Sequence, residues 1–248
     1  MKPLFTAAFL SVTFFCCSLS AFADPIDLSG WSTVVIYDDG TSPHSSPIWT
    51  IGSGGTSVTQ SVNSDPSAFL SDQTWTNTVF NGNFKVNTTD DDDFIGFVFG
   101  YASSEDFYLF DWKQNDQHWG PGGQGREGFT LSHITGNDIN LWDHSGNDIN
   151  VIADDYSSTN GWEDNISYQF TLSYTANNIN IAIDGDTIFD IDGSYAAGKF
   201  GFYNYSQPNV SYQGFTQTAA VPEPATMLLF GAGLAAFAGG ILRQRNSR

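Results

Sequence analysis

The sequence predicts an all-β domain built as a β-sandwich or jelly roll. Short runs rich in β-branched and aromatic residues recur along the chain, and turns rich in Gly, Asn, Asp and Ser separate them. Aromatic residues make up 15% of the chain, which is too many for a disordered protein. No convincing helical period of apolar residues occurs outside the two termini. Many short strands with regular turns are typical of a sandwich.

The individual strands are predicted from alternation or from continuous apolar character. In the run 79–86, Phe80, Phe84 and Val86 share one face, and polar side chains share the other. The run 94–101 is nearly all apolar, which suits a buried central strand. Asp184 and Gly185 between two strand runs predict a tight hairpin. The predicted strands are 31–37, 79–86, 94–101, 107–112, 129–134, 166–174, 179–183, 187–191, 200–205 and 210–215.

The N-terminus has the three parts of a secretory signal peptide. A positively charged start precedes an apolar run over 4–19 and a small-residue site that ends at Ala23. We therefore predict that 1–23 is removed on export. A membrane-anchoring helix is the alternative, although the run is short for a span. A second alternative is a lipoprotein signal, with Cys16 or Cys17 as the lipidated residue.

The C-terminus carries a second targeting pattern over 221–248. Pro222, Glu223 and Pro224 precede the apolar run 225–242, and arginines follow it directly. That run holds 18 uncharged residues, near the lower limit for a transmembrane helix, and the arginines should stay cytoplasmic. This arrangement closely resembles the PEP-CTERM sorting signal. The alternative is an ordinary tail anchor with a chance proline pair.

The PEP-CTERM resemblance implies a processing route. In that family the exosortase, a membrane protease, recognises the Pro-Glu-Pro motif and removes the tail. The protein is then released to the cell surface or the exopolysaccharide matrix of a Gram-negative bacterium. We therefore expect the exosortase as a partner, and contact with the membrane only through the C-terminal tail.

The predicted mature domain, 24–220, is strongly acidic. Of 27 acidic side chains only Glu223 lies outside it, and of 8 basic ones only Lys85, Lys113, Arg126 and Lys199 lie inside it. The domain thus carries 26 acidic and 4 basic side chains, a formal charge of −22. Such a surface repels nucleic acid and anionic lipid and favours divalent cations. No cysteine remains to form a disulfide.

The densest acidic run, Asp90 to Asp93, directly precedes the apolar strand that begins at Phe94. Four adjacent carboxylates repel one another strongly where the dielectric constant is low. Full solvation would relieve this repulsion, and so would a hard cation. Calcium takes six to eight oxygen ligands, and a loop supplies carboxylate and carbonyl oxygens. From spacing alone, a solvated acidic turn and a calcium site remain equally open.

Several segments resemble the thrombospondin C-terminal domain, over most of 31–216. They are NSDP from Asn63, FNGNFKVNT from Phe80, DDDFIGFVFGYASSEDFYLFDWKQ from Asp91 to Gln114, NGWED from Asn160 and GKFGF from Gly198. The resemblance implies a lectin-like β-sandwich of the concanavalin type that is extracellular and binds calcium. It also implies a role in adhesion or matrix contacts.

The resemblance also implies which residues bind the metal. The aspartate-rich loop of the family falls on Asp91, Asp92 and Asp93, with Asp90 in the same run, and Asn63 and Asp65 could face the same ion. The departures are a missing cysteine near Asn204 and the absence of the calcium-binding repeats that precede this domain in thrombospondins. Adhesion through those repeats or through animal receptors therefore cannot be carried over.

Other functions remain as alternatives. Among the tryptophans, Trp119 lies in a glycine-rich loop and is the best candidate for stacking on a sugar of an extracellular polysaccharide. A glycoside hydrolase of the same fold needs two facing carboxylates, but the Glu-x-Asp-x-x-Glu motif of such enzymes is absent. We interpret the GNDIN repeat at 136–140 and 146–150 as two similar loop turns rather than as a calcium-binding repeat. We expect a non-catalytic, calcium-binding, lectin-like protein.

Overall fold

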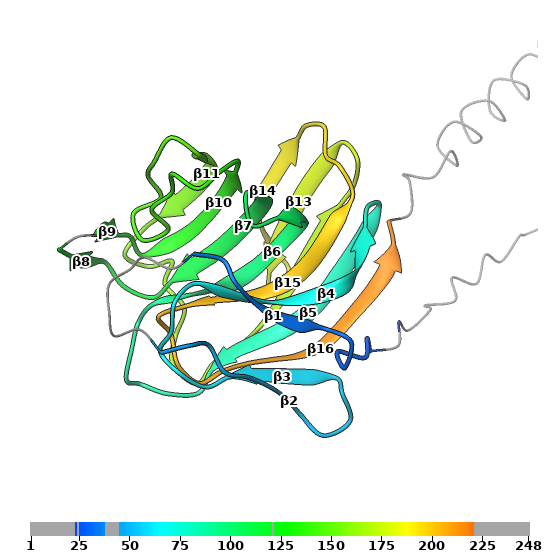
Figure 1. Ribbon diagram of the computed structural model, residues 1–248, viewed down its shortest axis with the longest axis horizontal. Helices are drawn as coiled ribbons and strands as arrows, with labels where there is room; N and C mark the ends of the chain where they lie inside the picture. The colour runs from blue at the N-terminus through cyan, green and yellow to red at the C-terminus, as the bar shows by residue number, and fades with distance from the viewer. Residues whose placement is uncertain (1–22, 24, 38–44, 121, 221–248) are drawn as a thin grey trace, which may run out of the picture.

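The computed structural model describes residues 23, 25–37, 45–120 and 122–220, which form a sandwich of two seven-stranded sheets (Figure 1). Every strand pair is antiparallel. In order, the first sheet contains β1 (Ser32–Val35), β4 (Ser67–Trp75), β15 (Gly198–Tyr205), β6 (Phe94–Ser103), β7 (Asp106–Lys113), β10 (Gly128–Ile134) and β11 (Ile149–Tyr156). The second contains β14 (Asp186–Asp192), β13 (Asn178–Ile183), β12 (Ser167–Tyr174), β5 (Thr78–Val86), β16 (Val210–Ala219), β3 (Ser57–Gln60) and β2 (Trp49–Ile51). A small hairpin of β8 (Gln117–Trp119) and β9 (Gly123–Gly125) projects from the sandwich.

The predicted all-β sandwich is confirmed, and each of the ten predicted segments contains a strand. Strand β5 alternates between buried and half-buried positions along its whole length, as predicted. Asp184 and Gly185 form the β13–β14 turn with φ of 52° and 91°, the left-handed values that a two-residue hairpin requires.

Six strands were missed by the sequence analysis: β2, β3, β4, β8, β9 and β11. The largest omission is β4, which pairs with both β1 and β15. Its second half, from Asp72 to Thr74, is exposed and polar, so the run lacks a clean alternation. Strand β11 was hidden because its first residues, Ile149 and Asn150, belong to the second GNDIN copy. The first predicted strand was too long, because β1 covers only Ser32–Val35.

The space between the sheets is filled mainly by aromatic rings. Phe200 of the first sheet and Phe215 of the second stack with ring centroids 4.6 Å apart. Phe170 packs against Phe97 across the interior at 5.0 Å. Burying one such ring contributes about 1.5–3 kcal/mol through the hydrophobic effect, so this layer stabilises a domain that has no disulfide.

A second apolar cluster covers the outer face of the first sheet. The loop between β10 and β11 places Trp142 against Phe94 at a ring distance of 5.5 Å. The same loop supplies His144, whose Nε2 lies 2.9 Å from an Asp111 carboxylate oxygen, and both side chains are buried. The first GNDIN copy and the start of the second lie in this loop, where the Asp138 amide donates to the Asp148 side chain. The second copy continues into β11, so only part of it is a loop turn.

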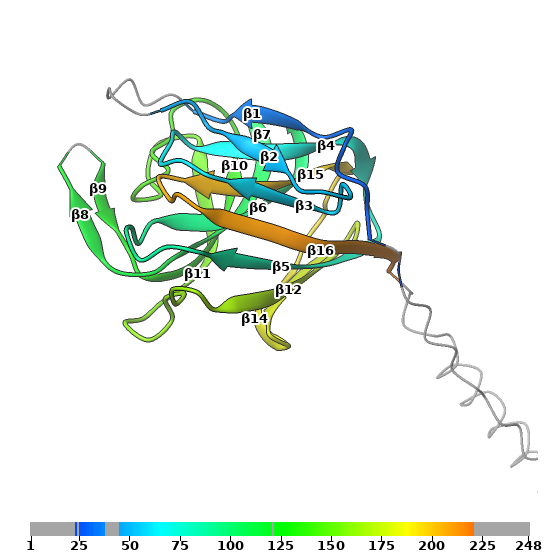
Figure 2. The same cartoon turned by 90° about the horizontal axis from the view of Figure 1, so that it is seen from below.

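Strands β5 and β16 pair along the length of the sandwich and run from one of its ends to the other (Figure 2). Val86 pairs with Val210 at one end, and Thr78 pairs with Ala219 at the other. At about 3.3 Å per residue, these ends are about 26 Å apart. The acidic run follows Val86, so it lies at the end of the sandwich opposite to the last described residues.

Residues 1–22 of the predicted signal peptide lie outside the described residues. So do the motif Pro222, Glu223 and Pro224 and the predicted span 225–242. Within the part of the chain that the structure describes, no helix is long and apolar enough to cross a bilayer.

The packing around Gly82 gives a first test. A Cβ atom on this buried residue of β5 would lie 2.7 Å from the Phe170 ring, which sits directly across the strand pair. We expect Gly82→Ala to lower the free energy of unfolding by about 1–3 kcal/mol in a urea titration, because the ring must move. Gly120→Ala is the control, since its Cβ would meet nothing within 4 Å. Equal stability of the two variants would contradict this packing.

Candidate functional site

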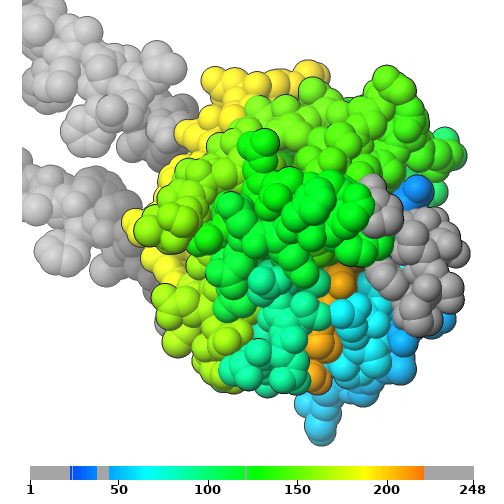
Figure 3. All heavy atoms as spheres, turned by 90° about the vertical axis from the view of Figure 1, so that its left-hand side faces the viewer, coloured from blue at the N-terminus to red at the C-terminus, as the bar shows by residue number. Residues whose placement is uncertain are grey.

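The acidic run forms a compact carboxylate group at the point where the chain enters the core. Asp93 directly precedes Phe94, the first residue of β6, and is buried, whereas Asp91 and Asp92 are half-buried. One oxygen from each of these three carboxylates lies within 4.8 Å of the others. Figure 3 looks onto this end of the sandwich, where the blue-green atoms around residue 90 lie beside the green β8–β9 region.

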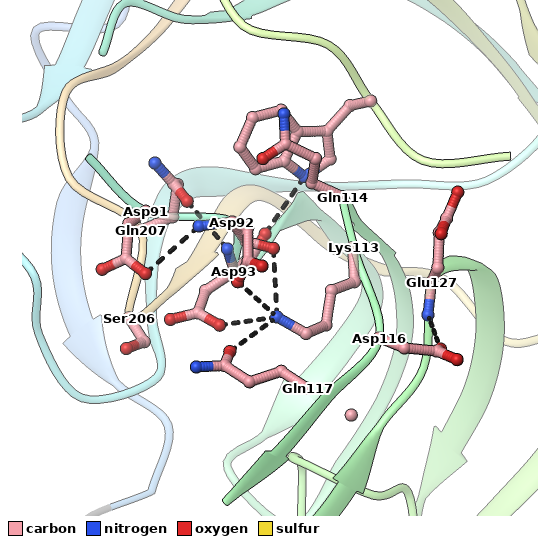
Figure 4. Close-up of polar contacts among 12 residues, drawn as sticks. Asp91, Asp92, Asp93, Lys113, Gln114, Asp116, Gln117, Glu127, Ser206 and Gln207 are labelled. Carbon is pink, nitrogen blue, oxygen red and sulfur yellow. Dashed lines mark hydrogen bonds and ion pairs between the residues drawn. The ribbon is translucent and has the colours of Figure 1, made fainter. Parts of the chain in front are cut away.

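A buried lysine faces this group (Figure 4). The Lys113 Nζ lies 2.7 Å from an Asp93 carboxylate oxygen and 3.1 Å from one of Asp92, and the lysine side chain is 0% exposed. It also donates to the Asp92 carbonyl oxygen and to the Gln117 side chain. This ammonium therefore supplies an internal positive charge to the acidic run.

The burial of Lys113 is tolerated because carboxylates and aromatic rings surround its ammonium group. Its Nζ lies 4.9 Å from the Trp142 ring centroid and 5.2 Å from that of Phe94, distances at which a cation is attracted to an aromatic ring. The β6–β7 pairing produces the contact, since Ile95 opposes Trp112 and Lys113 therefore lies beside the start of β6.

The backbone of Asp93 is also held from both sides. Its amide donates to the side-chain oxygen of buried Gln207 at 2.8 Å, and its carbonyl accepts from the Trp162 indole at 3.1 Å. These bonds fix the backbone of Asp93, and Lys113 holds its buried carboxylate. The acidic run is therefore not a fully solvated turn at Asp93.

Burial dominates the electrostatics of Asp93. Desolvation, with a smaller contribution from the charge of Asp91, raises the pKa of this carboxyl to about 6. Lys113 and the Ser206 hydroxyl act in the opposite direction by stabilising the charged form. The raised pKa means that burial penalises the charged form of Asp93 by more than Lys113 and Ser206 stabilise it.

Not all of the predicted calcium ligands lie beside Asp91, Asp92 and Asp93. Asn63 joins the group, because its side-chain amide donates to Asp91 at 2.7 Å and its oxygen accepts from Ser206. Asp90 and Asp65 are outside the set of three carboxylates that approach within 4.8 Å. Asp90 is exposed, and its amide donates to the Thr88 hydroxyl.

Trp119, the predicted sugar-stacking residue, lies on the β8–β9 hairpin. Its ring centroid is 5.6 Å from that of Trp142, and it packs at the edge of the second apolar cluster. It is half-buried, so part of its ring remains accessible.

Lys113, Gln117, Ser206 and Gln207 were missed by the sequence analysis. The signal for Lys113 was available, because a lysine stands at the end of the otherwise apolar and aromatic run FYLFDWK. No comparable signal marks Ser206 and Gln207, which reach Asp93 from the far end of β15.

The donor set fits a calcium ion. Calcium prefers carboxylate and carbonyl oxygens, and this group offers three carboxylates against one ammonium. Lys113 contacts one oxygen each of Asp92 and Asp93, so further carboxylate oxygens remain as ligands. Asp91, Asp92 and Asp93 would hold such an ion.

Two family models match the chain. The thrombospondin C-terminal region matches residues 44–219, which is more than half of the chain. The PEP-CTERM protein-sorting motif matches residues 220–244. Thrombospondin-3b of Danio rerio is 27% identical over 228 residues, covering 82% of this chain and 24% of that protein. Cartilage oligomeric matrix protein of Rattus norvegicus is 26% identical, covering 78% and 28%. The chain thus spans about a quarter of the length of these relatives.

Solved structures share the fold at low sequence identity. A carbohydrate-binding module, CBM66 from Bacillus subtilis, superposes with a TM-score of 0.52 at 14% identity, covering 76% of this chain and 94% of the module. A Bacillus subtilis protein of unknown function with a galectin-like fold gives 0.54 at 10% identity, covering 82% and 97%. These likenesses establish the lectin-like jelly-roll fold.

Replacing Lys113 by an uncharged residue tests whether its ammonium group stabilises the acidic run. We expect Lys113→Met to lower the free energy of unfolding by about 3 kcal/mol in urea titrations with chelator, because Asp93 loses its buried partner. Lys85→Met is the matched control, since Lys85 lies on the solvent face of β5. If both variants unfold at the same urea concentration, Lys113 does not stabilise the acidic run.

Proposed function

The chain belongs to the thrombospondin C-terminal family, and on that premise we propose that it is a non-catalytic, calcium-binding, lectin-like module that acts outside the cell in adhesion or matrix organisation. The observation that carries the proposal is the group of three carboxylates at the start of β6. Three carboxylates face one ammonium, and a divalent cation would neutralise the remaining negative charge.

The proposal includes export and sorting. The match to the PEP-CTERM motif supports processing by an exosortase and release at the surface or into the matrix of a Gram-negative bacterium. Under this proposal, residues 1–23 are the signal peptide, 24–220 the binding domain, 221–248 the sorting signal and 225–242 its transmembrane segment. Comparing the mass of the secreted protein with and without exosortase measures whether the tail is removed.

Carbohydrate binding is a second candidate function. A pocket lined by two tryptophans and by carboxylate and amide side chains favours this function. The pocket lies far from Asp91, Asp92 and Asp93. The extracellular ligand would be a polysaccharide, as expected from the sorting signal. A polysaccharide-cleaving activity is the third alternative, and release of reducing ends by the purified chain would identify it.

Calcium should stabilise the full-length chain. At free calcium about a hundred times its dissociation constant, mass action adds about 2.7 kcal/mol. We expect a rise of about 5–10 °C in the melting temperature relative to chelator. The double variant Asp92→Asn/Asp93→Asn should lose most of this rise.

The control for this variant removes two charges elsewhere. Asp186→Asn/Asp190→Asn changes exposed aspartates of the β13–β14 hairpin and should keep the rise. Identical melting curves in calcium and chelator for the unmodified chain would exclude the calcium proposal.

The calcium effect should depend on pH. Because the pKa of Asp93 is raised to about 6, a proton occupies this carboxyl at lower pH and competes with the metal. We expect the calcium-induced rise in melting temperature to be larger near pH 7.5 than near pH 5. Calorimetric titration at both pH values measures the difference. A rise that is larger at the acidic pH would contradict the role of Asp93 as a ligand.

A further inference from the structure

A pocket of about 360 Å³ lies at the end of the sandwich opposite to the carboxylate group. The segment before β1 forms one wall, where Ile26 bonds through its amide to the Phe215 carbonyl of β16. The last residues of β4 and the later part of β16 form the others. Its volume falls at the lower end of the range for small-molecule sites.

Two tryptophans line this pocket, Trp31 and Trp75. Trp31 is almost completely buried and is fixed by four phenylalanine rings, including Phe215 at a centroid distance of 5.4 Å. Trp75 is half-buried and packs edge-on against Phe80 at 5.4 Å. The rings are therefore held rigidly, and Trp75 keeps part of its surface accessible.

Polar side chains line the same pocket, and three of them have no partner inside the described part of the protein. Asp72, Gln73 and Gln217 are exposed and make no side-chain hydrogen bond or ion pair with any described residue. Gly30 makes room for one of them, since a Cβ atom there would lie 3.0 Å from an Asp72 carboxylate oxygen. The pocket thus combines rigid aromatic surface with unused hydrogen-bonding groups.

We propose that this pocket binds an uncharged saccharide, an inference that rests on the second candidate function. The C–H face of a sugar ring packs on Trp75, because the face of an aromatic ring is negative and the C–H bonds are positive. Carboxylate and amide oxygens of Asp72, Gln73 and Gln217 accept hydrogen bonds from the sugar hydroxyl groups. The amide nitrogens donate to the ring and hydroxyl oxygens.

Charge restricts the ligand to a neutral sugar. Asp27 and Asp72 both line the pocket, and no described lysine or arginine does. A uronic acid would meet two carboxylates in a domain whose formal charge is −22. The proposed calcium ligands Asp91, Asp92 and Asp93 lie at the other end of β5, about 26 Å away. Saccharide binding in this pocket therefore requires no calcium.

The test uses the full-length chain and four tetrasaccharide probes: cellotetraose, maltotetraose, mannotetraose and the acidic tetragalacturonate. Binding is followed by isothermal titration calorimetry and by tryptophan fluorescence, in chelator and in calcium. We expect at least one neutral tetrasaccharide to bind equally well in both conditions. Asp72→Ala/Gln217→Ala should weaken that binding at least about tenfold, because two hydrogen bonds are lost.

The control double variant, Asp186→Ala/Gln213→Ala, removes an exposed aspartate and an exposed β16 glutamine outside the pocket and should bind normally. Binding that survives in the pocket variant overturns this site but leaves carbohydrate binding intact. Failure of all three neutral probes overturns both. Binding that needs calcium, or a preference for tetragalacturonate, overturns the pocket and points to the carboxylate group.

Discussion

The structure of the site depends on the burial of a negative charge at the start of a core strand. Asp93 precedes β6, its backbone is fixed by Gln207 and Trp162, and its side chain is buried. A buried carboxylate is stable only with a compensating partner. Lys113 is that partner, and the two rings that surround its ammonium make its own burial tolerable. The β6–β7 pairing therefore joins the fold to the chemistry of the site.

The two proposed binding regions occupy opposite ends of one rigid scaffold. The carboxylate group follows the end of β5, whereas the tryptophan pocket lies beside the beginning of β5 and the end of β16. The described chain leaves the sandwich at the pocket end. A tether attached beyond Ala220 would direct the carboxylate group away from the membrane. A module arranged in this way could meet two ligands without competition between them.

The fold was predictable because its strands carry strong local signals, whereas the site depends on pairing register. Aromatic alternation marked β5, and a continuous apolar run marked β6, but the polar half of β4 gave no such signal. The carboxylates were found because they are adjacent in sequence. Lys113 carries a local signal as a lysine at the end of an apolar run, but its partners depend on register, and a β-bulge lies between Phe99 and Ser103. Counting back from the Ser103–Asp106 pair without the bulge would place Lys113 opposite Gly96, two residues away from its position beside Phe94.

Lys113 also changes what calcium would do for this protein. A site made only of carboxylates would leave strong repulsion in the absence of metal, and folding would then require the ion. Here one ammonium neutralises part of the charge, so less repulsion is left for a metal to relieve. The residual charge of the three carboxylates then sets the energy that calcium can add. A calcium ion held by Asp91, Asp92 and Asp93 would therefore stabilise this end of the sandwich by less than it would at a site without the lysine.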